Sequence, residues 1–452
     1  MLFRSLTATA DAVTPGSFAE FIALTGSTAN LTGGLQFTTP GAFSLGLDQS
    51  ALTADHVVIS AGNWVLPATA PATVGTLTGT SALSLSSGQD LVGYANLSTQ
   101  GSLTLVAGGR IDFGSLFALG AIDVTAGGSL TLADVTSGDS IDLTSQAVAA
   151  TGNLTAATSI SVTSASNVNT GNLSAGTGTP SGGNGDLYSI GIQSGGNVVT
   201  GSVFAASDLG IAAVGNLTTG AVRAYDTLLL AGGNVVVDSL SVVNRTLIAN
   251  SSMAALGQTP AGFDKELVFA AEPVATAGSI GITNASGSGS LAAAAGTTLS
   301  TGNITVSNSA RLSGGTGVTL GQLSAGTGTP TATGAGLIAV VSDGNVTTGN
   351  LTSSGDVRIA AGGSLTTGTV IGYDALLGAG TNVSITGLNI VNRTLIANSS
   401  MAALGDTPNG FDKELIFAAV PVATGGAVAI ANQSTFGTLR IAAGTTVSAG
   451  NL

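Results

Sequence analysis

The chain is poor in charge and in the side chains that enzymes use as nucleophiles and bases. Its 452 residues include no cysteine, one histidine and 10 lysines and arginines, and charged residues make up 7%, against about 25% in an ordinary globular domain. Without cysteine there is no disulfide scaffold. With a single histidine, Ser-His and Cys-His nucleophile systems are nearly excluded. A net charge of −13 without a basic stripe argues against nucleic acid as a partner.

Long apolar runs are also lacking. Gly, Ser or Thr interrupts every stretch of the length that a membrane span needs, so no membrane-spanning helix is predicted. Residues 1–13 contain one basic residue and no extended apolar stretch, and they do not form a signal peptide. If the protein is exported, we expect its signal to lie outside this chain.

Glycine (68 residues) and apolar residues (44%) are abundant, and they follow a short period. Triplets that are apolar, polar, apolar recur at steps of nineteen residues, and two-residue alternation is typical of a strand. A second apolar column keeps the same step, as do the pairs Leu209 and Leu228, and Ile211 and Leu230. The triplets are Leu103–Leu105, Ile122–Val124, Ile141–Leu143 and Ile160–Val162, and the second column is Leu116, Val135, Leu154 and Leu173.

Turn residues separate these columns, for example Gly127-Gly128, Gly152-Asn153 and Gly171-Asn172. Glycine and asparagine accept a positive φ, so we expect them to turn the corners. The pattern predicts an all-β fold, a right-handed parallel β-helix (β-solenoid) with coils of about 19 residues and lateral loop protrusions. Some 23 coils, a rod about 110 Å long, is the upper estimate. No helical spacing of apolar residues and no three-residue glycine period competes with it.

A longer period lies on top of the short one. Asn244–Gly257 recurs unchanged at Asn392–Gly405, an offset of 148 residues. We therefore divide the chain into an irregular segment at 1–29, degenerate coils at 30–151, and two copies of one long unit at 152–301 and 302–452. A solenoid needs a capping element over its last coil, so the array is expected to continue beyond residue 452.

Each copy contains one segment that breaks the nineteen-residue rhythm, at about 251–276 and 399–424. Both begin with a sequence that favours a short capped helical turn, and both contain a Phe-Asp-Lys-Glu sequence with one of the only two lysines of the chain. These charges form either a docking site for a partner or a neighbouring rod, or a local ion pair that holds the loop. The candidate partner-binding residues are Phe263, Asp264, Lys265, Glu266, Phe411, Asp412, Lys413 and Glu414.

Two acidic features are weaker candidates. Asp123 and Asp142 are expected to stack one coil apart on an outer face, either as a weak calcium bridge or, as we favour, as two solvated carboxylates. The sequence Gly182-Gly183-Asn184-Gly185-Asp186 is similar to a calcium-binding repeat, but it occurs once and lacks the aspartate in the second copy. A surface turn is the favoured interpretation of that sequence.

Few aromatic and ring side chains are available for recognition. Tyr225 recurs as Tyr373. An exposed tyrosine can stack on a sugar, but packing at a corner is the favoured interpretation. His56 and Trp64 are single and are expected to pack in the core or at a corner.

Columns of GNL, GSLTL and GGNV at a step of nineteen resemble those of filamentous-haemagglutinin-like proteins, the large repetitive exoproteins and adhesins of two-partner secretion in Gram-negative bacteria. The resemblance covers nearly the whole chain from about Asn30. It implies a right-handed parallel β-helix, export to the outer cell surface and attachment to cells. The secretion domain of that family is not recognisable here, and no binding residues carry over.

The favoured hypothesis is a non-enzymatic extracellular rod, an adhesin or structural stalk, with no catalytic, cofactor or metal residues. Its expected partner is a host or neighbouring cell surface, through a glycan or protein receptor. The alternative is a self-assembling filament built by end-to-end or lateral packing of β-helices. A polysaccharide-cleaving β-helix enzyme is disfavoured, because such enzymes need clustered carboxylates in one groove.

Overall fold

The structure is a computed structural model that divides into two compact units. Unit 1 comprises residues 1–180 and 187–215, and unit 2 comprises residues 181–186 and 216–452. We describe each unit by itself. The structure describes residues 2–3, 6–9, 20–25, 27–67, 70–71, 73–182, 189–252, 275, 277–287, 289–399, 417, 423, 425–434 and 437–451.

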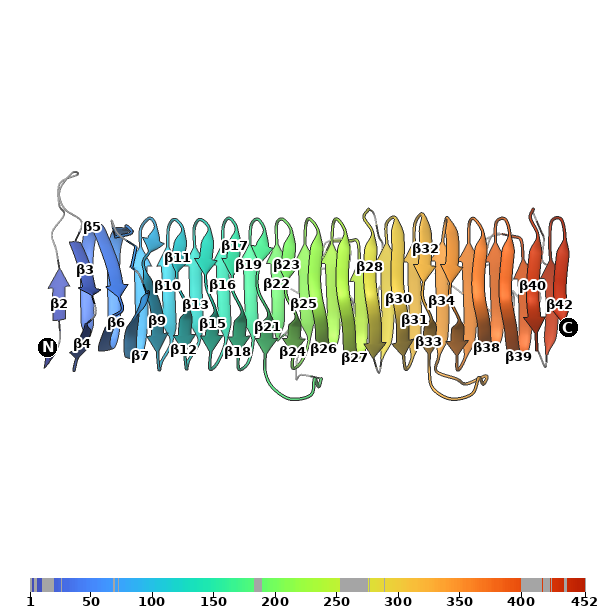
Figure 1. Cartoon of the computed structure of the whole chain (residues 1–452), viewed down its shortest axis with the longest axis horizontal. Helices are drawn as coiled ribbons and strands as arrows, with labels where there is room; N and C mark the ends of the chain where they lie inside the picture. Colours follow the sequence, from blue (N-terminus) through green and yellow to red (C-terminus); the bar gives the residue numbers. More distant parts are fainter. Residues whose placement is uncertain are drawn as a thin grey trace. The chain divides into compact units, whose positions relative to one another are not determined.

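The fold is a parallel β-solenoid of about 19 turns with a coil spacing of about 19 residues, as the sequence predicts. Within each unit, strands of successive coils lie side by side (Figure 1). Strands pair in parallel with their equivalents one coil on, so that Leu103 lies opposite Ile122 and Ile122 opposite Ile141. The predicted columns are therefore stacks of equivalent side chains.

A regular coil of unit 1 has three strands, which we call a, b and c. The a strands have five residues, and the b and c strands two or three. The a strands are β10 (Leu103–Ala107), β13 (Ile122–Ala126), β16 (Ile141–Ser145), β19 (Ile160–Ser164), β22 (Ile190–Ser194) and β25 (Leu209–Ala213). The b strands are β11 (Ile111–Phe113), β14 (Leu130–Leu132), β17 (Ala149–Thr151), β20 (Val168–Asn169) and β23 (Val198–Thr200). The c strands are β12 (Leu116–Ala118), β15 (Val135–Ser137), β18 (Leu154–Ala156), β21 (Leu173–Ala175) and β24 (Val203–Ala205).

The first coils of unit 1 are less regular, because some of their strands run through a corner without a break. These strands are β1 (Leu2–Phe3), β2 (Leu6–Thr9), β3 (Glu20–Thr25), β4 (Thr28–Leu31), β5 (Leu35–Asp48), β6 (Ala51–Trp64), β7 (Gly75–Ser87), β8 (Leu91–Val92) and β9 (Ala95–Thr99).

Unit 2 is also built of parallel coils, and the longest of its strands run through a corner without a break. Its strands before residue 330 are β26 (Leu217–Ala231), β27 (Val235–Ala249), β28 (Ile280–Gly287), β29 (Ser290–Ala295), β30 (Thr298–Val306), β31 (Ser309–Gly314), β32 (Gly317–Leu320) and β33 (Leu323–Ala325). The later ones are β34 (Leu337–Ser342), β35 (Asn345–Thr348), β36 (Leu351–Ser353), β37 (Asp356–Ala361), β38 (Leu365–Ala379), β39 (Val383–Ala397), β40 (Val428–Gln433), β41 (Thr438–Ala442) and β42 (Val447–Asn451).

The number of turns is below the upper estimate because insertions take up residues. The step between paired strands is much longer than one coil from Val235 to Ile280 and again from Val383 to Val428, where the sequence predicts interruptions. Two further insertions are not predicted by the sequence pattern. They lengthen the step from Ile160 to Ile190 in unit 1 and from Ser309 to Leu337 in unit 2.

The core consists of stacked aliphatic side chains, with one aromatic cluster in the first coils. Trp64 is 1% exposed and lies edge-on to Phe43 and Phe113, with ring centroids 4.6 and 6.0 Å away. Its indole nitrogen donates to the carbonyl of Ser86 at 3.2 Å, which confirms core packing for Trp64. His56 instead lies outside the core, with half of its side chain exposed and Asp55 3.7 Å away.

The prediction of positive φ at the Gly-Asn corners is wrong. Among the described residues, positive φ occurs at Gln49 and at glycines such as Gly176 and Gly278, next to insertions, but not at Gly152. An added Cβ at Gly152 would lie 2.4 Å from the Asp134 side chain of the previous coil. Glycine is therefore present because the coils approach closely.

The asparagines at these corners link successive coils. The Asn153 side-chain oxygen accepts the backbone N–H of Asn172, one coil on, at 2.8 Å. The Asn345 oxygen accepts that of Ser364 at 2.8 Å in unit 2. Each such bond satisfies a corner N–H that the strand ladders do not reach. We call this series of side-chain bonds the asparagine ladder.

Candidate functional site

The eight candidate partner-binding residues, 263–266 and 411–414, lie outside the described residues. The segments that contain them are bounded by buried side chains in both copies. Asn250 and Asn398 are 0% exposed, and each donates through its side-chain nitrogen to a carbonyl of the neighbouring coil, Gly233 and Thr381 respectively. The two insertions therefore leave the solenoid at equivalent, tightly bonded corners of unit 2.

In unit 2 we call the sheet of β29, β31, β34 and β37 the a face, together with the parts of β26, β27, β38, β39 and β41 that pair in line with it. A duplicated ion pair, which the sequence pattern did not predict, lies on this face beside each insertion. The Arg245 guanidinium is 2.7 Å from the Asp226 carboxylate, and that of Arg393 is 2.8 Å from Asp374. The aspartates are 1% and 2% exposed in their side chains, whereas the arginines are about a quarter exposed. Each aspartate also accepts the backbone N–H of its arginine, at 2.9 and 3.0 Å. In both pairs the aspartate and the arginine are nineteen residues apart, so the coil period could have predicted that they meet.

The a face next to these pairs is apolar on its outer side. A register shift in the β26–β27 pair, between Ala224 and Asp226, lengthens the coil step by one residue. As a result Leu228 pairs with Leu247. This column continues through Ala292 to the exposed Arg311, so it points outward. Leu228 therefore does not continue the inward column of Leu209, and Leu230, two residues on and on the same face, does not continue that of Ile211, so both expectations are wrong.

In the second copy the structure shows what covers this apolar face. Leu376, Leu395 and Ala397 point outward, are at most 1% exposed, and cluster with Phe417, which itself is 7% exposed. The Arg393 guanidinium lies over the Phe417 ring, with 4.5 Å between its central carbon and the ring centroid. We call Phe417 and its contacts on the a face the Phe417 seat.

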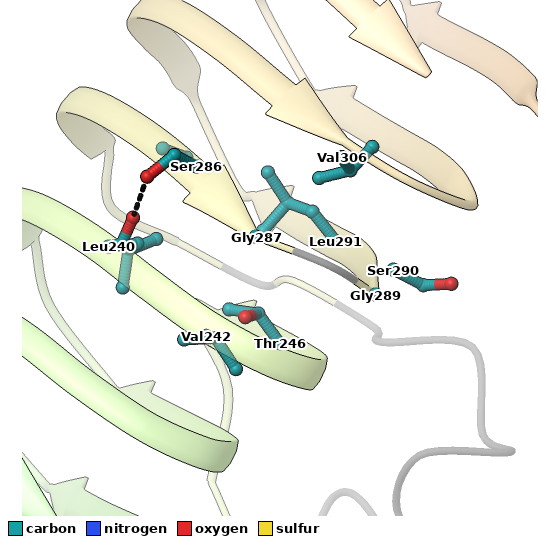
Figure 2. A pocket seen from close by; sticks show the side chains of 10 residues that line it. Leu240, Val242, Thr246, Ser286, Gly287, Gly289, Ser290, Leu291 and Val306 are labelled. Carbon is teal, nitrogen blue, oxygen red and sulfur yellow. Dashed lines mark hydrogen bonds between the residues drawn. The ribbon is translucent and has the colours of Figure 1, made fainter. Parts of the chain in front are cut away.

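A small cleft lies in unit 2 between β27 and the two strands that pair with it, β28 and β29 (Figure 2). Apolar side chains such as Leu240, Val242 and Leu291 line it together with Thr246 and hydroxyls including that of Ser286, which donates to the Leu240 carbonyl at 3.5 Å. Its volume is about 230 Å³ including space open to solvent, less than small-molecule pockets of about 300–1,000 Å³. The size of this cleft therefore gives no support for a small-molecule site.

Tyr225 and Tyr373 occupy equivalent half-buried corner positions. A Cβ added at Gly182 would lie 3.1 Å from the Tyr225 ring, so this ring packs against the backbone at Gly182. The Tyr373 backbone N–H donates to the Gly355 carbonyl at 2.6 Å. The packed position of Tyr225 matches the corner interpretation. Residues 183–186 of the calcium-repeat-like sequence lie outside the described residues.

Asp123 and Asp142 stack as predicted. They are opposite each other in the β13–β16 pair, and Ser161 follows Asp142 in the next coil. Partial burial raises the pKa of the Asp142 carboxyl above its ordinary value, a hydrogen bond with Ser161 lowers it, and repulsion from Asp123 adds to the rise. No group of three potential metal-ligating side chains occurs among the described residues.

This raised pKa predicts a pH dependence of stability. Because the folded-state pKa of Asp142 exceeds its unfolded value, the folded state favours the proton, and its contribution to stability is lost as the pH rises through the folded pKa. We therefore expect Asp142→Asn to stabilise unit 1 at pH 7 relative to the wild type and to have less effect at pH 3. Urea unfolding at both pH values measures this. Asp123→Asn should reproduce part of the gain, and an equal effect of Asp142→Asn at both pH values would refute the prediction.

Known proteins provide no closer guide to the site. No family model, curated protein or solved structure matches the chain. Among the described residues, no helix has the length and apolar character needed to cross a membrane.

Proposed function

We propose that the chain is a non-enzymatic rod on the outside of a bacterial cell, where it acts as an adhesin or as a structural stalk. The observation that carries this proposal is the use of polar side chains to join one coil to the next. The Asn153 oxygen bonds to Asn172, and the Asp134 oxygen bonds to Asn153, both at 2.8 Å. These groups stabilise a stack of coils, which is what a stalk requires.

The outer a face of unit 1 supports an adhesive role. Thr125, Thr144 and Thr163 are stacked one coil apart at exposed or half-buried outward positions. Hydroxyl groups donate and accept hydrogen bonds, so such a face offers many similar contacts to a glycan or a protein surface. The resemblance to filamentous-haemagglutinin-like exoproteins, which implies attachment to cells, supports the same role.

The test is binding of the folded chain to cells. Fluorescent beads coated with the purified protein are incubated with bacterial and epithelial cells and applied to a glycan array, and beads coated with the heat-unfolded chain are the control. An adhesin gives saturable binding that requires the fold. A stalk gives no binding but an elongated particle in small-angle X-ray scattering.

Two other results would overturn the proposal. Release of reducing ends from a polysaccharide panel would show an enzyme. Long filaments in electron micrographs of the purified protein would show the self-assembling fibre instead.

A further inference from the structure

We propose that Phe417 anchors the insertion between β39 and β40 to the a face of unit 2. Arg393, oriented by Asp374, and Arg440 hold Phe417 in this position. This inference does not depend on the proposed function. It concerns an attachment point on the solenoid, and it rests on contacts of the aromatic ring and on one contact of the backbone.

The ring is held by apolar packing and by a cation. Phe417 packs against the outward Leu376, Leu395 and Ala397, and the Arg393 guanidinium lies 4.5 Å from its centroid. A guanidinium within about 6 Å of a ring face is attracted by the ring electrons, more strongly when water is excluded. Asp374 fixes the guanidinium through contacts of 3.3 and 2.8 Å, and so presents its face to the ring.

The backbone is held by a second arginine. The Arg440 guanidinium donates to the Phe417 carbonyl at 2.7 Å. Arg440 lies in β41, next to Leu395 in the β39–β41 pair, so it adjoins the Phe417 seat. The first copy has the equivalents of Asp374 and Arg393, namely Asp226 and Arg245, but at the position of Arg440 it has Ala292. The first copy therefore has no arginine at the position that makes this contact in the second copy.

Proteolysis by a lysine-specific endoproteinase tests the anchor, because the chain has only two lysines, Lys265 and Lys413, one in each insertion. Cleavage of a folded protein follows the population of locally opened chain when opening is fast. We expect Phe417→Ala and Arg440→Gln each to accelerate cleavage at Lys413 by about tenfold, since each removes contacts whose loss shifts such an equilibrium by that order. Cleavage at Lys265 is the internal control and should not change. The fragments differ in length and are resolved by mass spectrometry.

Two further results complete the test. Arg393→Lys keeps the charge but loses the planar group, and it should accelerate cleavage at Lys413 by less than Phe417→Ala does. If Phe417→Ala also accelerates cleavage at Lys265, the variant has unfolded unit 2, and Arg440→Gln, at an exposed position, decides the matter. Unchanged cleavage at Lys413 in Arg440→Gln and in a folded Phe417→Ala protein would overturn the proposal.

Discussion

Replacing Arg245 by methionine is expected to destabilise unit 2 by about 3 kcal/mol or more, because it leaves a buried carboxylate without its cation. Asp226 is 1% exposed, and the Arg245 guanidinium lies 2.7 Å from it. Methionine keeps most of the aliphatic stem, so the loss is mainly electrostatic. Hydrogen exchange of β26 and β27 is the appropriate measurement, because stacked coils can open locally.

The chain supplies a matched control for this prediction. Arg110 pairs with Asp90 at 3.2 Å, one coil apart as well, but the two side chains are 47% and 42% exposed. Arg110→Met should therefore cost at most about 1 kcal/mol. In the double variant Asp226→Asn with Arg245→Met, much of the lost stability should return, since no buried charge remains. If Arg245→Met and Arg110→Met lower the free energy of unfolding equally, the burial of Asp226 does not make its ion pair more stabilising than an exposed one.

Replacing Gly289 by alanine is expected to disrupt the coil that contains β28 and β29, the first one after the insertion that follows β27. The new Cβ would lie 1.3 Å from the carbonyl oxygen of Asn244, a backbone atom that cannot move without moving β27. Gly437 has the same relation to Asn392, at 1.4 Å. Overpacking of this kind costs about 1–3 kcal/mol where the neighbour is a side chain that can adjust. Against backbone we expect a cost above that range, or failure of this coil to stack.

Gly281→Ala in β28 is the control for the Gly289 variant, because its nearest heavy atom, the Val235 carbonyl oxygen, would be 3.9 Å from the new Cβ. It should change stability by no more than about 0.5 kcal/mol. Circular dichroism during urea unfolding compares the two proteins. If Gly289→Ala is as stable as Gly281→Ala, the coils approach each other less closely at residue 289 than the structure shows.

The nineteen-residue period predicts the solenoid correctly, because a single physical requirement sets that period. Side chains that point inward must stack on equivalents one coil away, so Ile122, Ile141 and Ile160 align at a step of nineteen, as the strand pairs confirm. The ion pair of Asp226 and Arg245 obeys the same step and was predictable. A search for opposite charges nineteen residues apart would have found it in both copies.

Other features depend on contacts that a one-dimensional pattern does not contain. The pattern assigns Gly152 to a positive φ, whereas its role is to let two backbones approach. The outward position of Leu228 is shown only by its strand partners, because its column continues through Leu247 and Ala292 to the exposed Arg311. Burial of Leu395 depends on Phe417, a residue from an insertion that the coil period does not align. In each case a contact in three dimensions decides the outcome, and the nineteen-residue period alone does not describe that contact.

The unequal insertions after Ala175 and Ala325 have a consequence for how such a chain can change. They lengthen the step between a strands by different amounts, yet the a strands on either side pair without a shift, Ile160 with Ile190 and Ser309 with Leu337. The corner between a c strand and the next a strand thus absorbs differences in length, since the cost of closing a loop rises slowly with its size. A foreign peptide grafted at this corner would be displayed without altering the stack beneath it.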